Sequence, residues 1–322
     1  MKKIGVLTSG GDAPGMNAAI RAVTRYAIHI GMEVVGIKRG YNGLIKGGEE
    51  NLIPLDMRSV SNILQRGGTI LYTARCKEFR EWEGVLRAKQ TCVDNGIEGV
   101  VVIGGDGSFR GAADLSKAGI ACVGIPGTID NDISMSDYTI GYDTAMNTAV
   151  EAIDKLRDTA MSHDRCSIVE VMGRGAGYIA LHTGIACGAS YIMTKEEPHT
   201  VEVLVERIKK TKTEGRHHFI VVVSENIGGV EELAKIVEKE TGVESRATIL
   251  GHIQRGGSPT VRDRVAASRL GAHAVQLLAD GKAGRVVGFS REELVDYDIQ
   301  QALSMTKPFE NDLFEIAMKL SY

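Results

Sequence analysis

Two glycine-rich segments follow apolar runs and have the composition of phosphate-binding loops. The first covers residues 8–17 (TSGGDAPGMN) and the second residues 104–108 (GGDGS), and each stands where a strand would end and a helix would begin. Backbone N–H groups and the helix dipole attract phosphate at such a junction. Tight turns also need glycine for backbone geometry, so the first segment taken alone fits both interpretations.

Asp106 lies in the second segment, between Gly105 and Gly107. A carboxylate there would repel phosphate unless a hard cation lay between them, so we expect Asp106 to contact Mg²⁺ directly or through water. The alternative is a structural Asp106 that caps the following helix, although we expect Ser108 at the N-cap. Neither segment has Walker A spacing or reads as G-x-G-x-x-G with an acid about 20 residues on, which disfavours P-loop and ordinary dinucleotide sites.

Two carboxylates, Asp130 and Asp132, lie in a third loop, GIPGTIDND over residues 124–132. At the carboxyl end of a strand, such a pair can divide the work of phosphoryl transfer. One group can take a proton from a hydroxyl while the other helps to hold a metal. Asp and Asn are also common in Asx turns, so the loop alone leaves a structural role open.

Arginines next to loop glycines form a fourth group. They suit bidentate capture of phosphate oxygens, whereas a single exposed arginine is more often a solvated or paired surface residue. A chain with net charge -3 has no general basic field for nucleic acid, so anion recognition has to be local. The group comprises Arg75, Arg165, Arg174, Arg246 and, beside His252, Arg255.

The elements that would position these residues follow from a recurring pattern. Short β-branched runs are each followed by Gly, Asp or Thr and then by a helical stripe, which predicts βαβ units and parallel sheets. The first helical stripe predicts a helix with Pro14 in its first turn, Ile30 in its buried face, and Arg21 and Arg25 on the other face. The predicted strands are 4–7, 33–37, 99–103, 122–125, 167–171 and 219–223.

Length and composition limit the class of protein. The 322 residues allow two domains, and 43% hydrophobic with 25% charged residues is typical of a folded globular chain. No run approaches the ~18 apolar residues of a membrane span. The 5 cysteines are scattered, with no C-x-x-C pair, and fit thiols in a reducing compartment better than disulfides or zinc ligands. We therefore expect a cytoplasmic protein with neither a membrane nor nucleic acid as partner.

Motifs in family order along essentially the whole chain resemble the bacterial-type ATP-dependent 6-phosphofructokinases. The resemblance implies two Rossmann-like α/β domains with mainly parallel sheets, helices on both faces and an active site in the interdomain cleft. It implies a larger ATP-binding domain of residues 1–141 plus 254–305 and a smaller sugar-phosphate-binding domain of residues 142–253 plus 306–322. The motifs are LTSGGDAPGMNAAIR, RGGTILYTARC, VVIGGDGS, GIPGTIDNDI, GYDTAMNTAVEAIDKLRDTA, EVMGRGAG and LGHIQRGGSPTVRDRVAASRLGA.

The same resemblance implies the reaction. The chain would be a magnesium-dependent, allosteric, homotetrameric kinase of glycolysis that transfers the γ-phosphoryl group of ATP to the 1-hydroxyl of fructose 6-phosphate. Asp130 matches the general base, and Asp132 a support for the metal and the base. Thr128, Arg75 and Arg174 match groups that stabilise charge on the transferring phosphoryl group.

Binding residues are implied position by position. For ATP they are Gly11, Arg75, Cys76, Gly105, Asp106 as the Mg²⁺ residue, Gly107 and Ser108, with Tyr41, Phe79 and Arg80 on the adenosine side. For the sugar phosphate they are Thr128, Ile129, Asp130, Arg165, Met172, Gly173, Arg174, Glu225, Arg246, His252, Ile253, Gln254 and Arg255. Arg165 and Arg246 match residues supplied by a neighbouring subunit, so the implied site needs assembly.

An effector site for ADP or phosphoenolpyruvate at a subunit interface is implied as well. Ser190 stands where many relatives have a glutamate that helps to hold the effector's metal, and Glu214 where many have a basic residue. We therefore expect muted or altered allostery. The matching positions are Arg21, Ala22, Val23, Thr24, Arg25, Arg157, Gly188, Ala189, Ser190, Glu214, Arg216, His217 and His218.

Two glycines bear on the identity of the phosphoryl donor. Gly107 and Gly127 match the ATP-using branch, whereas pyrophosphate-dependent relatives usually have Asp and Lys there, and a carboxylate at 107 would repel the α-phosphate. ATP is therefore favoured, and the alternative is a pyrophosphate-dependent or other sugar-phosphate kinase of the same fold. A silent regulatory subunit would commonly lack a carboxylate such as Asp130, and an NAD-linked dehydrogenase has only the paired Rossmann-like pattern in its favour.

Overall fold

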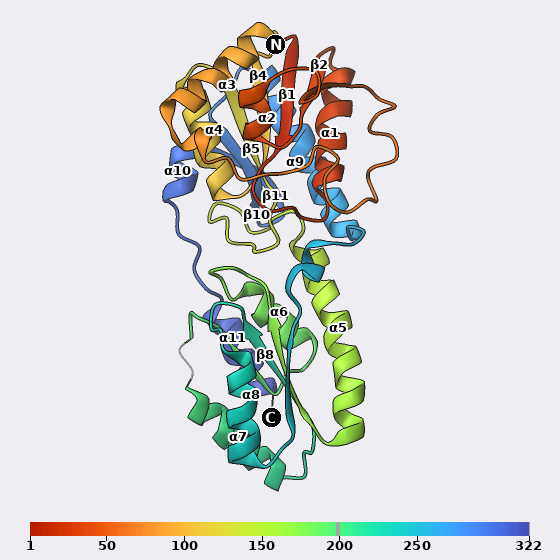
Figure 1. Cartoon of the computed structure of the whole chain (residues 1–322), viewed down its shortest axis with the longest axis vertical. Coiled ribbons are helices and arrows are strands. Elements are labelled where there is room, and N and C mark those ends of the chain that lie inside the picture. The colour runs from red at the N-terminus through yellow and green to blue at the C-terminus, as the bar shows by residue number, and fades with distance from the viewer. Residues whose placement is uncertain (198–199, 322) are drawn as a thin grey trace. The chain divides into compact units, whose positions relative to one another are not determined.

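The computed structural model describes residues 1–197 and 200–321, which form two compact units (Figure 1). The larger unit comprises residues 1–129, 133–144 and 255–307, and the smaller unit comprises residues 130–132, 145–254 and 308 onward. Each unit is thus assembled from separate stretches of chain. Among the described residues, no helix is long and apolar enough to cross a membrane.

A seven-stranded sheet organises the larger unit, in the order β11-β10-β5-β4-β1-β2-β3. The inner strands are parallel to one another, and the two edge strands, β3 and β11, are antiparallel to their neighbours. The strands are β1 (Lys3–Thr8), β2 (Glu33–Ile37), β3 (Leu52–Leu55), β4 (Gly99–Gly104), β5 (Ala121–Pro126), β10 (Arg285–Ser290) and β11 (Glu293–Asp298).

Helices cover both faces of this sheet, because buried strands carry apolar side chains on both sides. Val100 and Val102 of β4 share a core with one set of helices, α2 (Tyr41–Lys46), α3 (Trp82–Asp94), α4 (Asp106–Lys117) and α10 (Ile299–Ser304). On the other face α1 (Met16–His29) packs against α9 (Val261–Ala279), as Figure 1 shows. A Cβ on Gly271 would lie 2.7 Å from Ala22 Cβ, so this glycine permits the close packing of the two helices.

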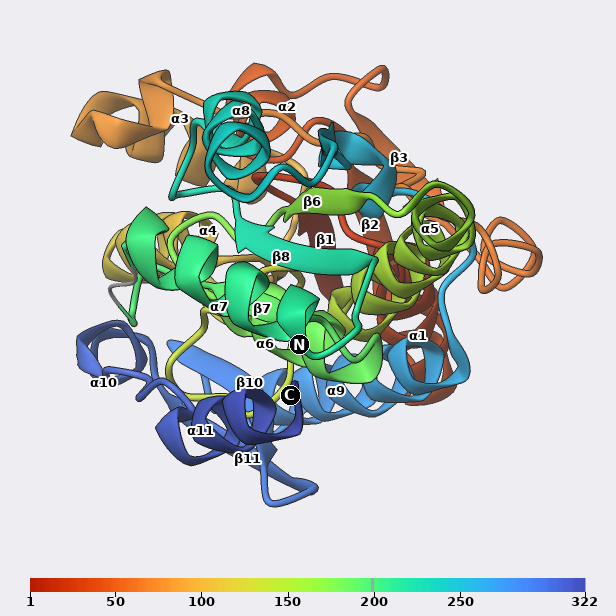
Figure 2. The ribbon, with the colours of Figure 1, turned by 90° about the horizontal axis from the view of Figure 1, so that it is seen from below.

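A four-stranded, all-parallel sheet in the order β7-β8-β6-β9 organises the smaller unit. Figure 2 shows β6 and β8 side by side at its centre. Alternate residues of β8, among them Val221 and Val223, share a core with α7 and α8. Ile192 of β7 instead approaches α6, where a Cβ on Gly184 would lie 2.5 Å from its Cδ1 atom. The bounds are β6 (Cys166–Val171), β7 (Tyr191–Met193), β8 (Phe219–Ser224), β9 (Ser245–Ile249), α6 (Tyr178–Ala186), α7 (Val201–Thr213) and α8 (Val230–Thr241).

The predicted α/β class is confirmed, and every predicted strand falls within β1, β2, β4, β5, β6 or β8. Three local predictions are wrong. Pro14 precedes α1, which starts at Met16 after Gly15 with φ 102°. Ile30 is 37% exposed because the helix has already ended at His29. The remaining elements are α5 (Tyr142–His163), α11 (Asn311–Leu320) and the short 3-10 helices η1 (Glu78–Arg80) and η2 (Gly251–Arg255).

The third wrong prediction concerns the start of α4. Ser108 was expected at the N-cap, but the N-cap is Gly105, and Ser108 lies inside the first helical turn. Its hydroxyl donates a hydrogen bond to the backbone oxygen of Ser9 at 3.0 Å. Ser108 therefore links two loops instead of capping its own helix.

Candidate active site

The loops after β1 and β4 lie together at a reversal of strand order. β2 flanks β1 on one side and β4 flanks it on the other, and in parallel sheets such a reversal leaves a crevice that binds ligands. The Ser108–Ser9 hydrogen bond joins the two loops. A Cβ on Gly104 would lie 2.5 Å from the same Ser9 oxygen, so only glycine allows this approach. The order of the strands therefore explains why the two glycine-rich segments lie next to each other.

The segment with Arg75 and Cys76 lies against the first of these loops. The Thr73 hydroxyl donates to the Gly10 oxygen at 2.8 Å, and the Asn42 amide donates to the Arg75 oxygen at 3.2 Å. The Arg75 side chain is exposed, as a group that captures an anion must be. Burial raises the pKa of the Cys76 thiol above its usual value, so this cysteine stays protonated at neutral pH and is no reactive thiolate.

Asp106 and Gly107 occupy the first turn of α4, whose N-cap is Gly105. A Cβ on Gly107 would meet no heavy atom within 4 Å, so the protein leaves open space there. Among the residues that the structure describes, no group of three or more His, Cys, Asp or Glu side chains could hold a metal ion. One carboxylate fits Mg²⁺ bound mainly by phosphate oxygens and water, and does not fit a metal held by the protein alone.

Arg255 lies at the same loops, although the sequence analysis assigned it to the sugar phosphate. Its Nη1 donates to the backbone oxygen of Asp12 at 3.1 Å. A Cβ on Gly11 would lie 2.7 Å from the same nitrogen. The larger unit therefore brings one residue predicted to contact ATP and one predicted to contact the sugar phosphate into direct contact.

The expected adenosine contacts of two aromatic residues are contradicted. Tyr41 and Phe79 are 4% and 5% exposed, and their rings stack with centroids 4.0 Å apart. The Tyr41 hydroxyl donates to the backbone oxygen of Ser108 at 2.6 Å, and burial raises the pKa of Tyr41 well above its usual value. These rings support the start of α4 from the core and offer no face to a nucleotide. Arg80, the third predicted neighbour, is exposed.

The loop after β5 carries the predicted base. The side chain of Asp130 is 3% exposed, and those of Thr128 and Asp132 are partly exposed. Ile129 is wholly buried, so its backbone and not its side chain is available to a ligand.

The smaller sheet has a reversal of its own, at β6, with β8 on one side and β9 on the other. The loop after β6 contains Met172, Gly173 and Arg174, and the loop after β9 contains Gln254. The Gln254 Oε1 atom accepts a hydrogen bond from the Met172 N–H at 2.8 Å. Glu225, directly after β8, accepts from the N–H groups of Gly173 and Arg174. Three loops thus converge on one turn.

The turn at Gly173 and Arg174 has positive φ values and carries the exposed cationic side chain of Arg174. Gly173 and Arg174 have φ values of 152° and 57°, and left-handed backbone is uncommon for a residue with a side chain. The Arg174 side chain is exposed, as are His252 and Ile253 on η2. The backbone contacts to Glu225 hold Arg174 in this conformation. The smaller unit therefore groups most of the residues predicted for the sugar phosphate.

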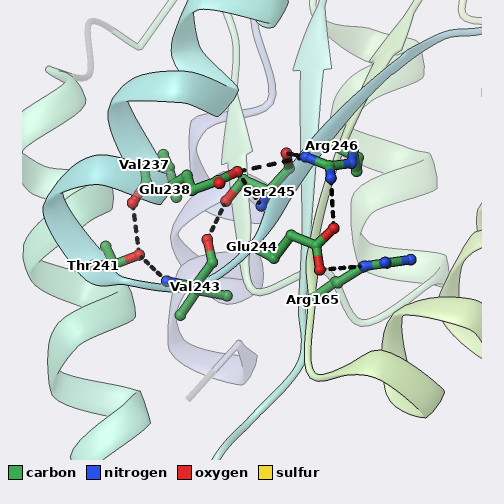
Figure 3. A network of polar contacts seen from close by, with 8 residues as sticks. All are labelled: Arg165, Val237, Glu238, Thr241, Val243, Glu244, Ser245 and Arg246. Carbon is green, nitrogen blue, oxygen red and sulfur yellow. Dashed lines mark hydrogen bonds and ion pairs between the residues drawn. The ribbon is translucent and has the colours of Figure 1, made fainter.

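Arg165 and Arg246 both contact Glu244 (Figure 3). Arg165 Nε lies 2.8 Å from one carboxylate oxygen, and Arg246 Nη2 lies 2.5 Å from the other. Arg246 also lies 3.5 Å from Glu238. The hydrogen bond from Arg165, followed by its charge and that of Arg246, lowers the pKa of Glu244. Both predicted phosphate-binding arginines are therefore paired with a carboxylate that stays ionised at neutral pH.

Comparison with known proteins assigns the family. The model of the family described as "Phosphofructokinase" matches residues 3–278. The chain belongs to the phosphofructokinase family. It is 57% identical over 317 residues to "ATP-dependent 6-phosphofructokinase 1" of Clostridium perfringens, which covers 98% of each chain. It is 55% identical over 321 residues to the "ATP-dependent 6-phosphofructokinase" of Clostridium botulinum (strain Loch Maree), which covers 100% of each chain. The resemblance drawn from the motifs is confirmed.

A solved phosphofructokinase shares the fold. The chain superposes on the structure of phosphofructokinase from Saccharomyces cerevisiae with a TM-score of 0.88 and 34% sequence identity. The match covers 100% of this chain and 48% of the yeast chain. The two-sheet architecture is therefore that of the phosphofructokinases.

The phosphofructokinase positions predicted for an effector are grouped only in part. Arg157 donates to the Cys187 oxygen, and burial together with the charges of Arg216 and Arg157 lowers the pKa of His218. Ser190 is buried, and its hydroxyl accepts from the Ile220 N–H at 3.3 Å. Five of the predicted effector positions are buried, namely Ala22, Val23, Thr24, Ala189 and Ser190. Partly or fully exposed are Arg21, Arg25, Arg157, Gly188, Glu214, Arg216, His217 and His218.

One polar residue of the larger unit escaped the sequence analysis. Asp263, in the first turn of α9, is wholly buried and accepts hydrogen bonds from residues 138–144. The available signal was the spacing of Thr260 and Asp263, which is that of a helix start and says nothing of contacts to a distant segment.

Proposed function

We propose that the chain is an ATP-dependent 6-phosphofructokinase. It transfers the γ-phosphoryl group of Mg-ATP to the 1-hydroxyl of fructose 6-phosphate and releases fructose 1,6-bisphosphate and ADP, the committed step of glycolysis. The observation that carries the proposal is the full-length identity of 57% and 55% to relatives with that printed name. The loops at both sheet reversals support it, since each combines glycines with the charged groups that phosphates require.

The two units divide the substrates in this proposal. ATP binds the larger unit at Gly11, Arg75, Cys76 and the start of α4, and fructose 6-phosphate binds the smaller unit at the turn of Arg174. The proposed domains are residues 1–141 plus 254–305 and residues 142–253 plus 306–322. The compact units differ from them by a few residues at each boundary and by the placement of residues 130–132 in the smaller unit. Support comes from the convergence of three loops on the Met172–Arg174 turn, a geometry suited to a ligand bound at a sheet reversal.

Each reacting group has an assigned role. Asp130 takes the proton from the 1-hydroxyl as its oxygen bonds to the γ-phosphorus, and the bond from that phosphorus to the β,γ-bridging oxygen breaks, which leaves ADP. Asp132 supports the base. Thr128, Arg75 and Arg174 stabilise the negative charge of the transferring group, the main contribution that a protein makes to such a loose transition state.

Magnesium belongs to the proposal as part of the ATP complex. When bound, it neutralises phosphate oxygens. Asp106 is the residue that would hold it, and the open space beside Gly107 leaves room for the phosphate chain. The single carboxylate agrees with a metal that keeps substrate oxygens and water as its other ligands.

Assembly and regulation extend the proposal. The enzyme is a homotetramer in which Arg165 and Arg246 reach the sugar phosphate of a neighbouring subunit. ADP or phosphoenolpyruvate binds another interface through Arg21, Arg25 and Arg157, with weakened effect because Ser190 cannot hold a metal. We place the enzyme in the cytoplasm, where a reducing environment keeps its cysteines as the free thiols that the structure contains. Strong ADP activation and phosphoenolpyruvate inhibition in an effector titration would contradict the weakened regulation.

The test is a coupled assay of fructose 1,6-bisphosphate formation, run with Mg-ATP and with Mg-pyrophosphate. The wild type is compared with Asp130→Ser and with Asp94→Ser, an exposed carboxylate on α3, as the control. We expect turnover with ATP alone, a loss of at least ~10²-fold in kcat for Asp130→Ser with nucleotide binding nearly unchanged, and wild-type rates for the control. Turnover with pyrophosphate would contradict the proposal that ATP is the phosphoryl donor. Retained turnover in Asp130→Ser would contradict the assignment of Asp130 as the base. No turnover with either donor would contradict the proposed activity.

A further inference from the structure

Asp263 is a buried carboxylate that the mechanism above does not use. It is 0% exposed, and its N–H donates to the Thr260 hydroxyl, which caps α9, at 3.3 Å. Its carboxylate accepts from the Tyr138 hydroxyl at 2.5 Å and from the Gly141 N–H at 2.7 Å. It also accepts from the N–H of Thr144 at 2.9 Å and from the hydroxyl of that residue at 2.5 Å. All of these donors belong to residues 138–144, so one carboxylate holds the whole segment.

That segment runs beside the turn after β5. The Ile140 N–H donates to the Pro126 oxygen at 3.0 Å, and Ile140 forms an isolated parallel bridge with Gly127. The Thr139 hydroxyl donates to the backbone oxygen of Thr128 at 2.6 Å. A continuous chain of hydrogen bonds and backbone therefore leads from the start of α9 to Thr128, within the larger unit.

The same turn is fixed to the loop after β4. The Gly127 N–H donates to the Gly104 oxygen at 3.0 Å, and a Cβ on Gly127 would lie 2.9 Å from Ile103 Cγ2. A shift of segment 138–144 would therefore displace the turn of Thr128 relative to the start of α4. Reacting groups generally have to be held within about 0.5 Å of the productive geometry, so such a shift would matter for catalysis.

Helix capping does not account for the burial of the Asp263 carboxyl group. Thr260 already caps α9, and a carboxylate taken out of water destabilises a fold unless it is fully hydrogen-bonded. Burial raises the pKa of Asp263, while the hydrogen bonds from Thr144 and Tyr138 oppose that shift. The carboxyl group lies where its hydrogen-bond donors all belong to the segment that supports the turn of Thr128.

We propose that Asp263 is a positioning residue for phosphoryl transfer. It holds segment 138–144, and that segment, through Thr139, fixes the backbone of Thr128 where the transferring phosphoryl group would lie. The inference rests on the proposed function, because it assumes that role for Thr128. We therefore expect changes at Asp263 to affect kcat, and we assign Asp263 no contact with either substrate.

Thr139 offers the sharpest test, because its hydroxyl is the last link to Thr128 and its side chain is 0% exposed. We expect Thr139→Val to lower kcat about tenfold or more with both KM values within about twofold of the wild type, and Thr139→Ser to restore kcat. The matched control is Thr183→Val in the smaller unit. Thr183 is also 0% exposed and donates to the Ile179 oxygen at 2.6 Å, so its loss should lower Tm similarly without changing kcat.

Asp263→Asn adds a direct test. The amide nitrogen cannot accept from Thr144, so we expect a lower Tm and a lower kcat than in the wild type. Wild-type kcat in Thr139→Val, or equal impairment by Ser and Val, would contradict the inference alone. Raised KM values at unchanged kcat would contradict it as well. Absence of turnover in the wild type would instead contradict the proposed function, and the inference with it.

Discussion

Gln254 accepts a hydrogen bond from the backbone N–H of Met172 at 2.8 Å, and this contact joins the loop after β9 to the loop after β6. Gln254 is 0% exposed, and its Nε2 atom has no hydrogen-bond partner within the described part of the chain. The side-chain carbonyl oxygen of Gln254 is therefore the atom that makes the structural contact. It acts together with Glu225 to fix the turn that presents Arg174.

The first prediction concerns Gln254→Leu. The change leaves the Met172 N–H buried without an acceptor, which costs about 1–3 kcal/mol and loosens the turn. We expect KM for fructose 6-phosphate to rise about tenfold, with the KM for ATP unchanged. Initial-rate kinetics test this against Gln90→Leu, at an exposed glutamine on α3 whose amide donates to Asp94. An unchanged KM for the sugar phosphate would show that the turn holds its shape without Gln254.

The second prediction is that substitutions at Gly107 and Gly127 have different effects, because the space around the two glycines differs. The space beside Gly107 is open, so we expect Gly107→Asp to leave Tm nearly unchanged while phosphate repulsion raises the KM for ATP at least ~10²-fold. Gly127 is different, since a Cβ would lie 2.9 Å from Ile103 Cγ2, and Gly127→Ala should lower Tm. Calorimetry and steady-state kinetics on both variants test this. A stable Gly107→Asp enzyme with normal ATP affinity would refute the argument from phosphate repulsion.

The third prediction concerns Glu244, whose contacts with Arg165 and Arg246 are drawn in Figure 3. Glu244 pairs with Arg165 and Arg246, so a phosphate that binds these arginines has to displace it. Glu244→Gln removes that competing charge, and we expect KM for fructose 6-phosphate to fall up to about fivefold. Glu240→Gln, in an exposed pair with Lys209 3.9 Å away, is the control. A raised KM would mean instead that Glu244 orients the arginines.

The fourth prediction is a pH dependence of stability from His218. Burial, followed by the charges of Arg216 and Arg157, lowers its pKa below the usual value of 6.5, while Asp164 opposes the shift. Between the folded and unfolded pKa values the unfolded state binds more protons. Stability is therefore complete above the unfolded pKa and declines as the pH falls through 6.5 toward the folded value. We expect Tm to drop less between pH 7 and 5 in His218→Asn than in the wild type. Equal slopes in calorimetry would exclude this contribution.

Most strands that are apolar on both faces were predictable, although the inner strand β10 (RVVGFS) and the short strand β7 (YIM) were missed. Strands with other patterns were not predicted. β4 and β8 read GVVVIG and FIVVVS, and buried parallel strands require such runs. β9 and β11 read SRATI and ELVDYD, where polar residues interrupt the pattern because these strands lie at sheet edges. β3, another edge strand, contains a proline that a central strand would not tolerate.

The site was predictable where chemistry resides in local motifs. Glycines and a carboxylate after an apolar run identified the start of α4 without any knowledge of its partners. The contacts of Gln254 with Met172, and of Asp263 with Tyr138, join residues 82 and 125 positions apart and leave no local pattern. Burial was equally invisible, which is why Tyr41 and Phe79 were misassigned to the adenosine.

The interleaving of the two units has a consequence for how the chain folds during synthesis. The larger sheet lacks β10 and β11 until residue 298 has been translated, and α1 lacks its partner α9 until residue 279. The apolar face of α1 therefore remains exposed while all strands of the smaller sheet are synthesised. Domains usually fold as units in the order of synthesis, but here the first strand translated belongs to the unit completed late.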